Sequence, residues 1–296
     1  MTPFRENLKG IAAMTAANLS FLLNDTQVKL AGDRLPMGEI IFLRGLFAAA
    51  LIGIAVIGLG LHRHVRVLFH RTVVWRTIGE VCATLLFLTA LFRMPIADIT
   101  AVLQVIPLVT TAAGAVFLAE RVGWRRWTAI VVGLIGVLIV LRPGGEGFNV
   151  FGVLALGAVL FISMRDIVTR VMPPGIPTML VAWVASIVVT LVGVGLGAGE
   201  DWVAPEAPDI GLTTGAGAFI AAGYWLAIVA MRHGDVAVVA PFRYTPIVGA
   251  IIVGYLIWGD VPDLPMVIGT VIIVGTGIYT FYRERRHARL IVGTNL

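Results

Sequence analysis

Charged residues are scarce in this sequence of 296 residues. They make up 13% of it, whereas hydrophobic residues make up 58%. An ordinary soluble domain is about a quarter charged. A soluble core of this length cannot enclose so much apolar side chain, so the surplus must face an apolar surrounding such as lipid. The composition therefore predicts an integral membrane protein.

Cysteine is nearly absent, and the familiar cofactor motifs are missing. Cys82 is the one cysteine, which excludes an intrachain disulfide and a zinc site made of several cysteines. There is no phosphate-binding loop, no His-Glu-x-x-His motif and no dinucleotide fingerprint. The five histidines fall in expected loops or in the C-terminal tail. We therefore predict no catalytic residue, no cofactor, no bound metal and no nucleotide site.

Apolar segments of about 20 residues, the length that crosses the hydrocarbon core of a bilayer, are abundant. Ten of them recur, separated by proline, glycine or charged residues, and they predict an all-α integral membrane fold with ten transmembrane helices. The predicted spans are Leu8–Leu30, Met37–Leu59, Val73–Phe92, Asp98–Leu118, Trp124–Leu141, Val150–Val171, Thr178–Leu196, Leu212–Met231, Val236–Trp258 and Leu264–Tyr282.

Lysine and arginine are distributed unevenly between alternate loops. Sixteen of the 22 fall on the side of the N-terminus and four on the other side, where the acidic loop 200–209 also lies. Because basic loops stay in the cytoplasm, this bias predicts a bacterial-type plasma (inner) membrane protein with both termini cytoplasmic. The basic tail then contacts lipid headgroups, and we expect no nucleic-acid partner.

The sequence also contains a weak internal repeat. At a shift of 141 residues Asp25 lies over Asp166, and at a shift of 139 Pro107 lies over Pro246. The predicted repeats are Met1–Pro143 and Gly144–Leu296, in one integrated membrane domain. Each repeat holds five spans, an odd number, so the second enters the membrane upside down. Inverted repeats of this kind build a central site that opens to either face.

The layout of prolines, glycines and charges resembles a known family. Its carriers are Pro36, Arg44, Pro107, Leu118-Ala119-Glu120, Gly133 and Gly136, with Pro177, Pro246, Asp260, Gly269 and Gly275 in the second half. This layout resembles the ten-helix EamA type of the drug/metabolite transporter superfamily, and its character is similar to YddG-type aromatic amino-acid exporters. The resemblance implies export of amino acids or related metabolites by alternating access. Gly259-Asp260 departs from the family's usual Gly-Glu but keeps a carboxylate.

Polar and aromatic side chains within the spans are the candidates for a substrate cavity, because such groups are costly in hydrocarbon and normally face the bundle interior. The predicted cavity residues are Asn18, Glu80, Thr84, Phe87, Gln104, Ser163, Trp225 and Tyr244. For Asn18 and Gln104 the alternative is a hydrogen bond to a neighbouring helix. Glu80 is the best candidate for proton coupling, although an i,i+4 pair with Arg76 needs no function.

A second group of residues is expected to act in gating. Pro107 and Pro246 each remove a backbone hydrogen bond in mid-helix, which predicts a hinge, with a static kink as the alternative. The remaining members of this group are Asp25, Arg44, Asp166 and Arg170. We favour a structural ion pair between Asp25 and Arg44, and a gate or a topology charge pair for Asp166 and Arg170.

Three functions compete at this point. The first is a secondary transporter for amino acids, with aromatic or hydrophobic ones favoured, or for related small metabolites. The second is an integral-membrane enzyme that acts on lipid or isoprenoid, which usually needs clustered acids with a metal. The third is a membrane scaffold, which leaves the inverted repeat unexplained. The repeat therefore favours a transporter whose partners are a small-molecule substrate and the bilayer.

Overall fold

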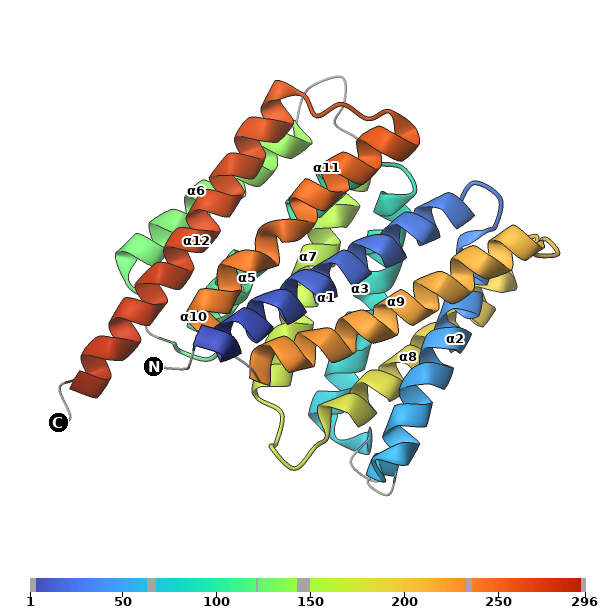
Figure 1. Ribbon diagram of the computed structural model, residues 1–296, viewed down its shortest axis with the longest axis horizontal. Coiled ribbons are helices and arrows are strands. Elements are labelled where there is room, and N and C mark those ends of the chain that lie inside the picture. Colours follow the sequence, from blue (N-terminus) through green and yellow to red (C-terminus); the bar gives the residue numbers. More distant parts are fainter. Residues whose placement is uncertain (1–3, 63–67, 121, 143–149, 233–235, 294–296) are drawn as a thin grey trace. The chain divides into compact units, whose positions relative to one another are not determined.

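The chain forms helices almost throughout. The computed structural model describes residues 4–62, 68–120, 122–142, 150–232 and 236–293, and it contains no strand within these ranges (Figure 1). The helices are α1 (Phe4–Ala31), α2 (Met37–Gly58), α3 (Arg71–Leu91), α4 (Ile96–Leu103), α5 (Ile106–Phe117), α6 (Trp124–Leu141), α7 (Val150–Arg170), α8 (Thr178–Gly197), α9 (Ala207–Arg232), α10 (Val236–Val239), η2 (Ala240–Tyr244), α11 (Thr245–Trp258) and α12 (Leu264–Gly293).

Nine helical segments of the described residues are long and apolar enough to cross a membrane. They correspond to nine of the ten predicted spans, with α4 and α5 joined as Ile96–Phe117 and the η2–α11 segment running over Pro241–Trp258. The tenth is α1, whose apolar sequence is interrupted by Asn18, Asn24 and Asp25. The predicted all-α fold of ten transmembrane helices is confirmed.

Several helices begin where proline or a polar side chain favours a start. Pro36, Pro95 and Pro177 occupy the N-cap positions of α2, α4 and α8. The residue before a helix needs no helical backbone, so proline does no harm there. At α3 the ring of His70 accepts a hydrogen bond from the backbone N–H of Thr72, at 3.3 Å. These signals explain why the predicted starts of α2, α3, α4 and α8 lie within two residues of the observed starts.

The fourth and ninth predicted spans are each broken. Leu103 ends α4, and Pro107 lies in the first turn of α5. In the second half, a 3₁₀ segment separates α10 from α11, and Pro246 lies in the first turn of α11. Proline is tolerated in a first turn because its missing N–H has no partner there in any case. Both prolines therefore coincide with a real interruption of the helix.

The chain divides into two compact units, which are described separately. The first unit comprises Met1–Leu19, Met94–Val153 and Trp225–Leu296, and the second comprises Ser20–Arg93 and Leu154–Tyr224. Each unit thus takes helices from both predicted repeats. The division into the repeats themselves stays a prediction, and its boundary at residues 143 and 144 lies outside the described residues.

In the second unit, α2 packs against α8, its equivalent in the other half. A Cβ atom on Gly38 would lie 2.8 Å from the carbonyl oxygen of Gly193, near the C-terminal end of α8. Fifteen residues further along α2, a Cβ on Gly53 would lie 2.7 Å from Nε1 of Trp183, near the start of α8. Residue numbers increase along α2 in the direction in which they decrease along α8. The two equivalent helices therefore run antiparallel.

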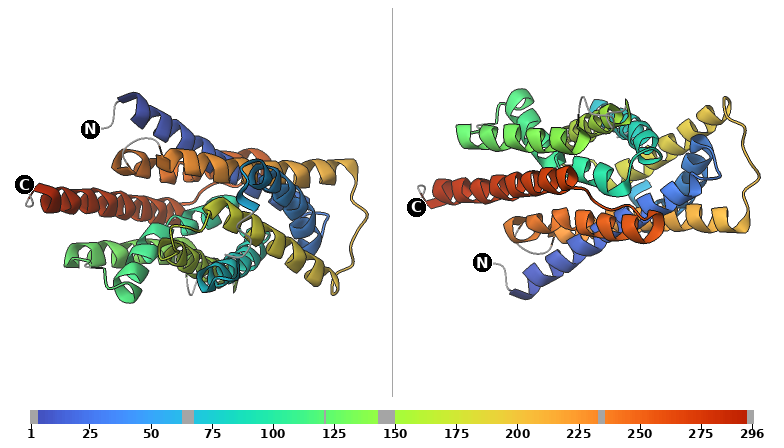
Figure 2. Two further views of the ribbon diagram at one scale, coloured as in Figure 1. Left: turned by 90° about the horizontal axis from the view of Figure 1, so that it is seen from below. Right: turned by 90° about the horizontal axis from the view of Figure 1, so that it is seen from above.

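The first unit repeats this arrangement with α6 and α12, which lie side by side in both projections (Figures 1 and 2). A Cβ on Gly133 would lie 3.0 Å from Oγ1 of Thr276, and a Cβ on Gly269 would lie 2.6 Å from Cγ2 of Val140. These helices are also antiparallel. Two equivalent pairs that run in opposite directions are what inverted repeats require.

Candidate functional site

A buried charged pair lies in the middle of α3. Arg76 and Glu80 are one helical turn apart, and their side chains are only 7% and 13% exposed. Nη2 of Arg76 lies 3.6 Å from Oε2 of Glu80. Ionised groups at membrane depth are costly, so they normally pair with one another or face a wet cavity. This pair therefore marks a candidate site.

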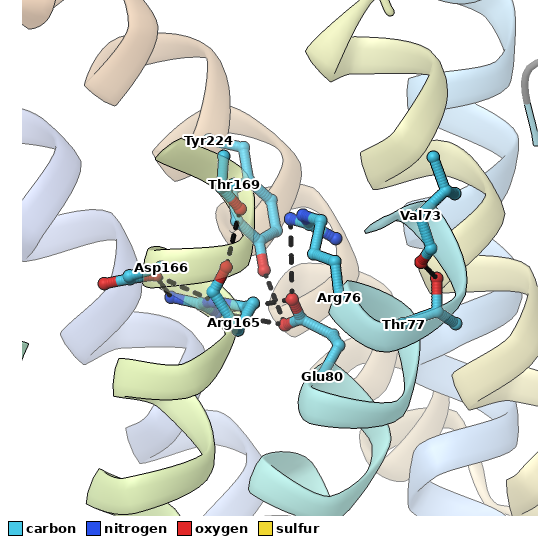
Figure 3. A network of polar contacts seen from close by, with 8 residues as sticks. All are labelled: Val73, Arg76, Thr77, Glu80, Arg165, Asp166, Thr169 and Tyr224. Carbon is cyan, nitrogen blue, oxygen red and sulfur yellow. Dashed lines mark hydrogen bonds and ion pairs between the residues drawn. The ribbon is translucent and has the colours of Figure 1, made fainter. Parts of the chain in front are cut away.

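Glu80 binds two further helices of the second unit (Figure 3). Nη1 of Arg165, on α7, donates to both carboxylate oxygens of Glu80 at 3.3 Å. The hydroxyl of Tyr224, on α9, donates to Oε1 at 3.1 Å. Arg165 is itself held by Asp166, whose Oδ1 accepts from Nε and Nη2 at 3.0 and 2.9 Å. One carboxylate thus ties α3, α7 and α9 together.

The close approach of α3 and α7 depends on a glycine. Gly79 precedes Glu80, and a Cβ atom there would lie 3.1 Å from Cε of Met164 and 3.2 Å from Cβ of Arg165. A larger residue would push the helices apart and lengthen the hydrogen bonds from Arg165 to Glu80. The small residue at this position therefore serves the polar network.

A cavity opens beside this network, inside the second unit. Its volume is about 40 Å³. The helices around it are α2 and α3 from the first half of the chain and α8 and α9 from the second. The polar residues that line it are Arg44, Arg76, Glu80, Thr84, Ser186 and Tyr224. The rest of its wall is apolar, including Ile52, Val189 and Ile220.

Arg76 has donors that no described residue satisfies. Its Nε and Nη1 atoms are buried and have no hydrogen-bond partner in the part of the chain that the structure covers. A buried donor without a partner costs about 1–3 kcal/mol. Such a cost is retained in a protein when a ligand or water supplies the missing acceptor. Arg76 also lines the cavity, so its guanidinium group borders the space that a ligand could enter.

Arg44 reaches the cavity from α2 and is connected to α1 on its other side. Its Nη1 atom lies 3.5 Å from Oδ1 of Asn24, and Nδ2 of Asn24 donates to Oδ1 of Asp25 at 2.8 Å. We expected a direct ion pair between Asp25 and Arg44. The structure instead places the amide of Asn24 between the two charged groups.

The other predicted residues of the second unit differ in whether they line the cavity. Thr84 lines it, and Phe87, one turn along α3, is half-buried. Ser163 is 2% exposed, and its hydroxyl has no partner among the described residues. Asp166 pairs with Arg165, whereas Arg170 lies exposed in the last turn of α7.

Four predicted cavity residues belong to the first unit. The side chain of Asn18 donates to the carbonyl oxygen of Phe242 at 2.8 Å, the helix-to-helix alternative for this residue. Gln104 is buried at the end of α4. Tyr244 is 6% exposed and packs against Gly277, whereas Trp225 is 58% exposed. None of these four residues is among those that line the cavity of the second unit.

Sequence reasoning missed the two most important partners of Glu80. Arg165 is not among the predicted site residues, although it lies within a predicted span, five residues before the end of α7. The predicted cavity residues include Trp225 but not its neighbour Tyr224, whereas in the structure Tyr224 lines the cavity. The internal repeat held a usable indication, because it aligns Arg165 with Asn24, and each of these side chains contacts a buried charged group.

Comparison with known proteins agrees with this architecture. Residues 8–142 and 151–282 each match the model of the EamA-like transporter family. The S-adenosylmethionine uptake transporter of Rickettsia conorii is 27% identical, with 94% of each chain covered. The riboflavin transporter of Vibrio cholerae serotype O1 is 28% identical, with 95% of this chain and 96% of that protein covered.

Two further proteins are similar over nearly the whole length. The pseudopaline exporter of Pseudomonas aeruginosa is 27% identical, with 90% of this chain and 93% of that protein covered. A solved crystal structure, 21% identical, superposes with a TM-score of 0.63 over 93% of this chain and 98% of that one. At this identity, the likeness to the crystal structure shows the fold alone.

Proposed function

Because this chain belongs to the EamA-like transporter family, we propose that it is a secondary transporter that moves a small metabolite across the inner membrane by alternating access. The observation that carries the proposal is the polar cavity of the second unit, where Arg76 retains unsatisfied donors in a segment long and apolar enough to span a bilayer. A purely structural helix bundle has no use for such a group.

The finer proposal concerns the cargo and the direction. We propose amino acids, with aromatic or other hydrophobic ones favoured, or related metabolites, and export from the cell. The relatives are named for S-adenosylmethionine, riboflavin and pseudopaline. S-adenosylmethionine contains an amino-acid group, which supports a site for molecules of that kind. The relatives are named for both uptake and export, so direction is measured separately from cargo.

Alternating access is supported by the antiparallel equivalent helices and by the paired interruptions at Pro107 and Pro246. Inverted repeats can exchange conformations with each other, which moves the opening from one face to the other. We propose that the two interruptions are hinges, and that Glu80 is the residue through which a proton gradient acts. Both termini are proposed to lie in the cytoplasm.

Proteoliposomes test the function. Purified protein is reconstituted, the vesicles are loaded with an unlabelled amino acid, S-adenosylmethionine or riboflavin, and entry of the labelled compound is followed against protein-free vesicles. We expect protein-dependent exchange of at least one amino acid or amino-acid derivative. A folded, reconstituted protein that exchanges none of them would remove the proposed cargo class.

A further inference from the structure

We infer that the cavity beside Arg76 is a subsite for the carboxylate group of the transported molecule. This inference rests on the proposed function, because it identifies the cargo as a carboxylate-bearing metabolite. Amides and decarboxylated amines of the same size and shape are excluded from the class. Three features of the cavity support this assignment: unsatisfied donors, charge and size.

The free donors belong to Arg76. A guanidinium group has five N–H donors and no acceptor, so whatever satisfies it must bring acceptor atoms. Its ion-pair partner, Glu80, does not fill this role in the structure. The carboxylate of Glu80 already accepts from Arg165 and Tyr224, and its nearest approach to Arg76 is 3.6 Å. No described residue supplies an acceptor to Nε and Nη1 of Arg76, so we infer that the transported molecule supplies it.

The charge of the cavity favours an anion. Its charged lining residues are two arginines, Arg44 and Arg76, and one glutamate, Glu80. The acidic neighbour of Arg44, Asp25, is reached through Asn24 and does not line the cavity. One negative group in the cavity would balance the charges of these three lining residues. Neutralising a buried charge with a paired, hydrogen-bonded counter-ion is how proteins keep such groups inside.

The size of the cavity favours a carboxylate over a larger anion. Its volume is about 40 Å³. Since about 10–15 Å³ of such volume holds one water molecule, the cavity holds about three. A carboxylate has three heavy atoms, whereas a phosphate has five. The hydroxyls of Thr84 and Ser186 in the wall offer further donors to the same small group.

The test compares matched ligands on the unmodified protein, so no variant needs to fold. The probes are L-phenylalanine with L-phenylalaninamide, S-adenosylmethionine with its decarboxylated form, and inorganic phosphate. Each is used in vesicle exchange and in thermal unfolding of the detergent-purified protein. We expect at least one acid to be exchanged and to raise the unfolding midpoint, with its amide or decarboxylated partner at least tenfold weaker, since a hydrogen bond to a charged group contributes about this factor.

Variants locate the effect at Arg76. Arg76→Gln is expected to remove the preference for the acid, and Arg76→Lys to weaken it by a smaller factor, because lysine keeps the charge but not the planar donor group. Arg71→Gln is the matched control, since Arg71 is exposed at the start of the same helix. It is expected to keep the preference unchanged.

The possible results separate the subsite from the proposed function. Equal response to acid and amide, or an acid preference that survives in a folded Arg76→Gln protein, would overturn the subsite while transport stands. Stabilisation by phosphate but by no carboxylate would overturn it as well, as would the absence of stabilisation by every acid. Acid stabilisation that depends on Arg76, without exchange of any probe, would support the subsite and contradict the proposed transport function.

Discussion

At the scale of single residues, the site depends on how one carboxylate is shared. Glu80 accepts hydrogen bonds from Arg165 and Tyr224, which belong to the second half of the chain. It also forms an ion pair with Arg76 on its own helix. Arg76 is buried and Arg165 is half-buried, so both cations need a counter-ion, and the tyrosine adds a neutral donor. Removing the charge of Glu80 must therefore cost more than removing any one donor.

We predict that Glu80→Gln lowers the free energy of unfolding by about 3 kcal/mol, because it leaves the buried Arg76 without its counter-ion and Arg165 with Asp166 alone. Tyr224→Phe removes one hydrogen bond and is expected to cost about 1 kcal/mol. Thermal unfolding of the purified variants, monitored by tryptophan fluorescence, measures both effects. In vesicles, Glu80→Gln is also expected to abolish any stimulation of flux by an imposed pH gradient. Equal losses in the two variants would contradict the central role of the carboxylate.

At the scale of helices, the prolines act at equivalent places in the two halves. Pro107 opens α5 after the break that follows α4, and Pro246 opens α11 after the 3₁₀ segment. Each break removes regular backbone hydrogen bonds from a membrane-spanning segment. Such a point bends at lower cost than a continuous helix does.

If these breaks are hinges, Pro107→Ala and Pro246→Ala should reduce the exchange rate several-fold while the unfolding midpoint stays the same or rises, because alanine favours a continuous, stiffer helix. Pro265→Ala is the control, since Pro265 lies in the first turn of α12 and follows no break within a span. Flux in proteoliposomes, corrected for the amount of protein inserted, measures the difference. Unchanged flux in both hinge variants would identify the breaks as static kinks.

At the scale of the whole molecule, the loop charges predict the orientation in the membrane. The loop before α9 is acidic and exposed, whereas the residue that begins α3 is an exposed arginine. The excess of lysine and arginine on one side of the chain predicts that the start of α3 lies in the cytoplasm and the acidic loop outside.

Cysteine labelling in intact cells tests this orientation. In a Cys82→Ala background, Asp201→Cys is expected to react with a membrane-impermeant maleimide added outside, and Arg71→Cys only after the membrane is permeabilised. Both positions are exposed, so accessibility to solvent does not differ between them. The reverse pattern of labelling would place the termini outside the cytoplasm.

Much of the architecture could be predicted because it depends on patterns along the chain. The length and spacing of the apolar segments specify helices of bilayer length, and α6 begins and ends at the predicted residues. The two largest differences between predicted and observed helix ends lie in α9 and α12. The start of α9 lies five residues earlier than expected, where Asp209 accepts a hydrogen bond from the backbone N–H of Glu206 at 2.9 Å. The end of α12 lies at Gly293, beyond the last apolar turn.

The sequence by itself determined the membrane environment, the number of helices and the antiparallel repetition, because lipid imposes length and hydropathy on each segment independently of its neighbours. The tertiary structure alone decided which polar groups meet. That Glu80 contacts Arg165 as well as Arg76, and that Tyr224 rather than Trp225 lines the cavity, depends on how each helix is rotated and how closely Gly79 lets two helices approach. Rotation and approach are set by packing between segments far apart in the chain, which periodicity within one segment does not contain.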